Sequence, residues 1–139
     1  MKKLFIVFVI ATLGFSCKQN ITESDLNNLN GYWEIEKVIL PNGEKKEYKI
    51  NETIDYFKLV KNKGFRKKVM PQVDGSYLTN NLMESVYISL EEGSAILHYK
   101  TNYAQWNEEI IAVSNDKFIV KNQQELVYHY KRPVKFSVK

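Results

Sequence analysis

The chain has 139 residues, of which 44% are hydrophobic, enough for one domain with a real core. Its 20 lysines and arginines against 16 aspartates and glutamates give a net charge of +4, too small a bias to argue for a nucleic-acid partner. A single cysteine excludes an internal disulfide, so hydrophobic burial has to stabilise the fold.

The first seventeen residues have the organisation of a bacterial lipoprotein signal. Lys2 and Lys3 give a positive start, an apolar run of 12 residues follows at 4–15, and Cys17 comes directly after Ser16. A helix that crosses a bilayer core needs about 20 residues, so this run is too short to span and is expected to be removed. Residues 1–16 would then be the signal peptide, and Cys17 would become the acylated, palmitate-bearing N-terminus. An ordinary secretion signal cut nearby, or a short buried helix, is the alternative.

Residues 17–30 are expected to form the lipidated tether and one short helical turn. The segment is polar, and Thr22 followed by Asp25 is a capping-type start for a helix. Leu26 and Leu29 are three residues apart and share one face of that turn. From residue 31 to residue 139 the pattern changes, and we expect one β domain there.

After Gly31 apolar residues recur at every second position, as in half-buried strands, and turn residues separate the runs. Trp33 and Ile35 begin the first strand, which ends at a turn around Asn42 and Gly43. The later strands are expected at 44–50, 53–60, 65–70, 77–79, 83–90, 94–101, 104–113, 117–121 and 125–132. The sequence therefore predicts eight to ten strands joined by short links.

That many short strands would leave two exposed sheet edges unless the sheet closes on itself. Closure at about eight strands gives a barrel just wide enough for side chains or one small ligand. An open sandwich of two sheets is the alternative architecture. Because the links are short and sequential, without a long crossover of the Greek-key kind, the sequence favours an all-β, antiparallel up-and-down barrel.

The segment from Leu29 to Trp33 resembles the start of the lipocalins, where a helical turn leads into Gly-x-Trp at the head of the first strand. The layout of residues 24–132 is similar to that of lipocalin-like lipoproteins of Bacteroidota. The resemblance implies that Trp33 closes one end of the barrel and that Arg132, near the end of the last strand, packs across its ring. Such a cation–π contact is worth about 1–2 kcal/mol if desolvated. The resemblance does not identify a ligand.

A ligand would enter at the opposite end, between the middle and late strands. Tyr99, Tyr128 and Tyr130 lie on the more apolar faces of their strands, and Trp106 could join them. A tyrosine offers an apolar ring and a hydroxyl tip, which suits an amphipathic guest. The alternative is that these rings fill the interior and leave no cavity.

The chain shows no constellation for catalysis or for a metal. His98 and His129 lie on the face opposite the apolar set of their strands, so we expect them to be exposed and not to share a metal site. Glu108 and Glu109 are neighbours on one strand and therefore point to opposite faces. No nucleophile elbow, phosphate loop or dinucleotide-binding fingerprint is present. We expect no enzyme activity, no metal and no cofactor.

One local charge bias remains, a run of basic residues comprising Lys61, Lys63, Arg66, Lys67 and Lys68. It could meet anionic headgroups at a membrane surface. We interpret it as a solvated hairpin tip whose lysines also protect an edge strand.

The sequence thus predicts a monomeric, non-enzymatic lipoprotein of the cell envelope that binds a small hydrophobic or amphipathic ligand. Its membrane partner would be reached through acylated Cys17. Residues 18–20 lack an acidic cluster resembling a surface-export signal, so the periplasmic face of the outer membrane is expected. The alternatives are an interaction module with a filled barrel that docks a protein or glycan through its outer face and loops, and carbohydrate binding by rings on the outside.

Overall fold

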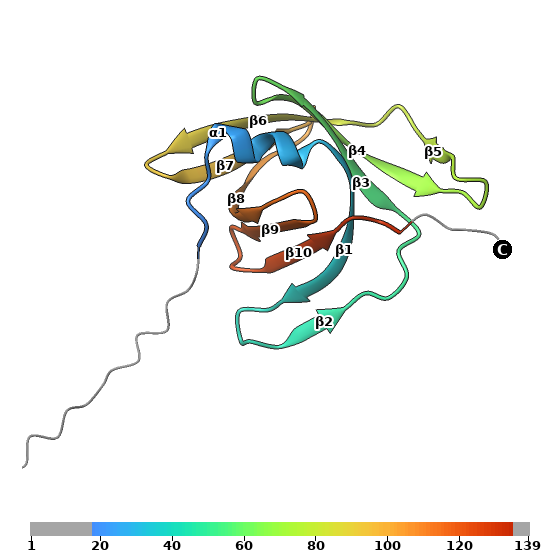
Figure 1. The fold of residues 1–139 in the computed structure, drawn as a ribbon, viewed down its shortest axis with the longest axis horizontal. Coiled ribbons are helices and arrows are strands. Elements are labelled where there is room, and N and C mark those ends of the chain that lie inside the picture. Colours follow the sequence, from blue (N-terminus) through green and yellow to red (C-terminus); the bar gives the residue numbers. More distant parts are fainter. Residues whose placement is uncertain (1–17, 135–139) are drawn as a thin grey trace, which may run out of the picture.

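The computed structural model describes residues 18–134 as a short helical segment followed by ten strands (Figure 1). The helical segment is α1 (Glu23–Leu26) and the 3₁₀ turn η1 (Asn27–Leu29). The strands are β1 (Gly31–Ile39), β2 (Lys45–Glu47), β3 (Ile54–Val60), β4 (Lys63–Pro71), β5 (Tyr77–Thr79), β6 (Glu84–Glu91), β7 (Ser94–Lys100), β8 (Gln105–Val113), β9 (Lys117–Asn122) and β10 (Val127–Lys131). Within residues 18–134 no helix has the length and hydropathy needed to cross a membrane.

Eight of the strands form a closed antiparallel barrel. Neighbours pair in the order β1, β3, β4, β6, β7, β8, β9 and β10, and β10 pairs back with β1 from Glu34 opposite Lys131 to Ile39 opposite Val127. The remaining two strands lie outside this circle, β2 beside β1 and β5 beside β4. The predicted up-and-down barrel with one short helix before its first strand is confirmed, and the open sandwich is excluded.

Tight turns explain why sequential strands become neighbours. Lys61 and Asn62 between β3 and β4 both have positive φ, as do Glu92 and Gly93 between β6 and β7. Two residues with positive φ form the hairpin turn whose twist matches that of the flanking strands. Each turn therefore returns the chain directly alongside the strand it has just left.

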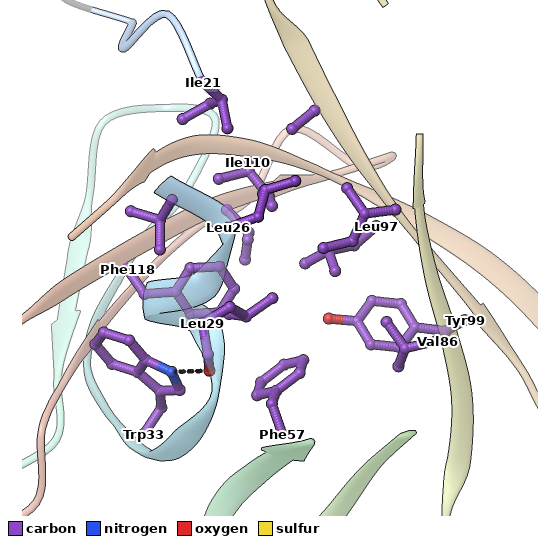
Figure 2. Packing of buried hydrophobic residues seen from close by; sticks show 14 residues of the cluster. Ile21, Leu26, Leu29, Trp33, Phe57, Val86, Leu97, Tyr99, Ile110 and Phe118 are labelled. Atoms are coloured by element: carbon purple, nitrogen blue, oxygen red, sulfur yellow. Dashed lines mark hydrogen bonds between the residues drawn. The ribbon is translucent and has the colours of Figure 1, made fainter. Parts of the chain in front are cut away.

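The helical segment covers the end of the barrel at which these turns lie (Figure 1). The Thr22 side chain and the Asp25 side chain cap α1 reciprocally, which is the capping box predicted from the sequence. Leu26 and Leu29 point into the barrel and are buried. They join an apolar cluster in which Leu29, Trp33 and Phe118 lie side by side (Figure 2). This end of the barrel is therefore filled by side chains.

The other end of the barrel is built differently, because β4 has two partners. Residues 63–66 of β4 pair with β6, whereas residues 69–71 pair with β5. Beyond the pair formed by Arg66 and Glu84, β4 and β6 separate, and the β5 hairpin stands off the wall (Figure 1). The barrel wall is therefore interrupted at this end, which we call the open end.

Candidate functional site

Arg132 fastens the closed end. Its guanidinium carbon lies 3.6 Å from the centroid of the Trp33 ring. Its three nitrogens donate hydrogen bonds to backbone carbonyls of three separate segments: Nε to Asn115 at 2.8 Å, Nη1 to Tyr32 at 3.0 Å and Nη2 to Asn28 at 2.6 Å. One planar cation thus joins the helical segment, β1 and the link before β9. The Trp33 indole Nε1 adds a bond of 2.8 Å to the Leu29 carbonyl (Figure 2).

The contact between Arg132 and Trp33 also explains why a glycine stands at position 31. Gly31 has a φ of +107°, and a Cβ at this position would lie 3.2 Å from Arg132 Nη1. Asn30 fixes the preceding turn to β3, since its Oδ1 accepts from the Leu59 amide at 2.6 Å and its Nδ2 donates to the Leu59 carbonyl at 3.3 Å. The motif formed by Gly31 and Trp33 therefore has a structural role at the closed end.

Tyr99 lies at the boundary between the apolar cluster and the open end. Its side chain is 2% exposed, and its hydroxyl points into the barrel (Figure 2). The Arg66 guanidinium carbon lies 4.1 Å from the centroid of the Tyr99 ring, and the Trp106 ring stacks on Tyr99 at 5.4 Å. Burial raises the pKa of Tyr99 well above its usual value, so the hydroxyl stays protonated.

The other predicted interior rings continue this layer. Tyr130 stacks on Phe118 with 5.2 Å between centroids, and Tyr128 and Tyr130 both pack against the apolar cluster. Tyr130 lines a surface hollow together with Lys37 and His129, whereas Tyr99, Trp106 and Tyr128 line none of five hollows on residues 18–134. Contact of these four residues with a ligand stays a prediction.

The basic run around residue 66 is not a solvated hairpin tip, and that interpretation is wrong for Arg66. The alternation of β4 turns Arg66 inward, where it is almost buried, hydrogen-bonds Glu84 on β6 and lies 3.9 Å from Glu108 on β8. Lys68, two residues on, forms an ion pair with buried Asp55 on β3. Facing carboxylates from three strands compensate the two cations, and sequence reasoning missed this cluster.

The cluster of Asp55, Arg66, Lys68, Glu84 and Glu108 contains one more carboxylate than cations. Glu108 is the least well paired of the three carboxylates, because Arg66 bonds Glu84 and approaches Glu108 only to 3.9 Å. Burial raises the pKa of Glu108, while the charge of Arg66 opposes the shift. The buried polar atoms of the cluster face one another: Asp55 Oδ1 lies against Lys68 Nζ, and the Tyr99 hydroxyl hydrogen-bonds Glu108, which opposes part of the rise in the pKa of Glu108.

A hollow of about 750 Å³ opens beside this cluster, at the place where β4 and β6 separate. Lys68 and Glu84 line it. Its outer part carries apolar side chains that are strongly exposed, Leu82 at 76% and Tyr103 at 97%. The full lining is Lys68, Asn80, Leu82, Met83, Glu84, Ser85, Lys100, Thr101, Asn102 and Tyr103. This hollow is amphipathic: it has a charged wall and an apolar rim.

Neither histidine lines this hollow. His98 stacks on the half-exposed Tyr87 ring at 4.2 Å and bonds Ser89 and Asn107, all on the outer face. His129 is paired with Lys37 across β10 and β1. In the described part of the chain no three histidine, cysteine, aspartate or glutamate side chains are grouped to hold a metal. Cys17 lies outside the described residues.

One family model matches most of the chain. A family model described as a lipocalin-like domain matches residues 29–120. A solved structure of a lipocalin-like protein from Bacteroides uniformis ATCC 8492 is 12% identical, with a TM-score of 0.49 over 76% of this chain and 99% of that chain. No curated protein matches the chain.

Substitution of Arg132 tests whether its contacts stabilise the closed end. Lysine keeps the charge but cannot reach three carbonyls and cover the indole at once, so R132K and R132A should each lower the free energy of unfolding by about 2–4 kcal/mol. Urea unfolding followed by tryptophan fluorescence measures this. The control is K131A, whose surface ion pair with Glu34 spans 3.7 Å and should contribute less than about 1 kcal/mol. An R132K variant as stable as the wild type would contradict the assignment.

The pH dependence of stability tests the environment of Glu108. Because the pKa of Glu108 is raised in the folded state, its contribution to stability is fully present below its usual pKa of 4.5 and is lost as the pH rises through the raised value. E108Q is uncharged at every pH, so the difference between its melting temperature and that of the wild type should move in favour of E108Q as the pH rises above the usual pKa of 4.5. E109Q, on the outer face, is the matched control and should show no such gain. Parallel curves for E108Q and the wild type would contradict the assignment.

Proposed function

The chain belongs to the lipocalin-like domain family, and from this premise we propose that it captures one small amphipathic molecule at the open end of its barrel. The observation that carries the proposal is the hollow of about 750 Å³ beside the ion-pair cluster. Ligand sites of small-molecule binding proteins commonly enclose about 300–1,000 Å³. The barrel would act as a carrier or buffer, without catalysis.

The lining of the hollow supports an amphipathic guest. Leu82, Met83 and Tyr103 offer apolar surface, whose burial contributes about 25 cal/mol for each Å². Lys68 and Glu84 offer charges that are held in place by their partners Asp55 and Arg66. Apolar burial would supply affinity, and the fixed charges would orient the polar end of the guest.

The packed half of the barrel limits how deeply a guest could enter. Trp33 and Leu29 are fully buried at the closed end, and Tyr99 is buried beneath the cluster. A guest would therefore bind at the side of the open end and would not run along the barrel axis. Of the predicted ring residues, Trp106, Tyr128 and Tyr130 are partly buried and Tyr99 is buried, so the first three would be reached before Tyr99.

We also propose that acylated Cys17 holds the protein in the cell envelope, at the periplasmic face of the outer membrane. Lys18, the next residue, contacts Glu109 and Ser94, and the Gln19 amide bonds the Ile111 carbonyl at 3.0 Å. The chain is thus tied to the barrel directly after Cys17. An anchor at this residue would keep the barrel beside the membrane, as a monomer, without a long tether.

A docking role is the second candidate, because the open end carries exposed apolar side chains beyond the hollow. Val73 and Leu78 on the β5 hairpin are 73% and 57% exposed. Such surface would suit a protein partner as well as a small molecule. The two functions differ in their response to a small apolar probe, which only the capture function predicts to bind in the hollow.

Binding of the apolar fluorescent probe N-phenyl-1-naphthylamine tests capture. The protein without its signal should enhance the fluorescence of the probe, and L82S should weaken binding by about tenfold because apolar lining is lost. V60S is the matched control, since Val60 is 69% exposed and lies at the other end of the barrel. Absence of binding, or equal weakening by both variants, would exclude capture in this hollow.

Mass spectrometry of the protein extracted from membranes with mild detergent tests the anchor. The mature chain should begin at Cys17 and carry the mass of the attached acyl chains. C17S should retain residues 1–16, because the processing that depends on the cysteine cannot occur. A chain cut elsewhere with a free Cys17 thiol would show that the protein is secreted without a lipid.

A further inference from the structure

We propose that the captured molecule is an amphiphile with an anionic polar end, and that Lys100 on the wall of the hollow attracts this anion. The inference rests on the proposed capture function and names its class of ligand. It follows from the charges that line the hollow, from the hydrogen-bond donors that its lining leaves unused, and from the position of its apolar side chains.

The charges on the wall of the hollow are mostly positive. Lys68 and Lys100 line the hollow, and Glu84 is its one acidic lining residue. Because Arg66 hydrogen-bonds Glu84, the negative charge of Glu84 is already compensated by a cation of the protein. Lys100 forms no ion pair with a carboxylate of residues 18–134. An anion at this wall would therefore meet an ammonium group that has no carboxylate partner in that part of the chain.

The other carboxylates of this region lie behind the wall. Asp55 is 3% exposed and pairs with Lys68, and Glu108 accepts a hydrogen bond from Tyr99 and does not line the hollow. When Lys100 is included, the cations and carboxylates of the region are equal in number, but two of the cations and only one of the carboxylates line the hollow. Since the interaction between charges falls with distance, a guest responds most to the lining charges.

The lining also leaves hydrogen-bond donors unused. Asn80 accepts from the Leu82 amide through its Oδ1 at 3.0 Å, which leaves its Nδ2 group to donate. Thr101 Oγ1 accepts from the amides of Tyr103 at 3.2 Å and Ala104 at 3.1 Å, so its hydroxyl proton remains to donate. A lysine ammonium can only donate, and an ionised acid can only accept. An anionic group therefore matches what this lining offers.

The apolar side chains of the hollow flank Lys100 from two links. Leu82 and Met83, 76% and 53% exposed, come directly before β6, and Ser85 of β6 lies opposite Lys100 of β7. Tyr103, 97% exposed, lies in the link that follows Lys100. One guest could thus place its charge at the ammonium and its apolar chain on these exposed side chains, which is the layout that an amphiphile requires.

Two charged ligands of equal chain length, decanoate and decylamine, test the sign of the selected charge, each displacing N-phenyl-1-naphthylamine below its micelle-forming concentration. At neutral pH the first is an anion and the second is a cation. Decanoate should bind the wild type about fivefold more tightly than decylamine, as expected for an exposed charge. K100E should reverse this order, because the lining would then carry two acids and one lysine.

Uncharged decanol and a distant lysine provide the controls. K100E should keep the affinities for decanol and for the uncharged probe within about twofold of the wild type, because Lys100 is exposed and does not belong to the apolar cluster. K63E should retain the wild-type order, since Lys63 is exposed and begins β4 at the other end of the barrel, opposite Val60.

Each outcome decides between the hypotheses. Decylamine binding the wild type as tightly as decanoate, or an order that K100E leaves unchanged, would overturn the selection of an anion while leaving capture intact. A reversal by K63E as large as that by K100E would assign the preference to the net charge of the protein, which also overturns the inference. Failure of the probe and of all three ligands to bind would refute the capture function itself.

Discussion

The pairing of β10 with β1 is the constraint on which the rest of the structure depends. It turns a ribbon with two free edges into a barrel, and it places Arg132 over Trp33 at the seam. Because the guanidinium bonds carbonyls in η1 and in the link before β9, the seam, the helical segment and the closed end form one unit. A barrel closed in this way has a fixed interior, so every inward side chain must fit a volume set by eight strands.

That interior is divided into an apolar half and a charged half, and Tyr99 is the boundary between them. Its ring contacts the apolar cluster, the Arg66 guanidinium and the Trp106 ring. Charges buried at this depth are tolerated only when they are paired, which explains why three carboxylates from β3, β6 and β8 face the two cations of β4. Each cation of the cluster therefore has a carboxylate partner on a neighbouring strand.

The sequence predicted the barrel well and the charged cluster not at all, for one physical reason. The alternation of side chains assigns residues to the two faces of a strand. It does not say which face points into the barrel when both faces carry polar and apolar residues. On β4 the run of basic residues suggested a solvated hairpin tip, whereas Arg66 faces inward and Phe65 packs near Tyr56 on the outside. Only the register, with Arg66 opposite Glu84, identifies the inner face, and register between distant strands is not contained in the pattern of one strand. The strand pattern likewise did not indicate that β5 pairs with the end of β4 and thereby interrupts the barrel wall.

The break in the wall connects the fold to binding. Because β4 leaves β6 after Arg66 to pair with β5, the ion pairs formed by Arg66 and Lys68 lie beside a surface hollow and are not sealed inside the barrel. Under the proposed capture function, a guest would therefore present its polar end to the charged half without displacing any residue of the apolar half. The closed end, with Trp33 and Arg132, lies away from this hollow, and its contacts hold the strands together at the seam.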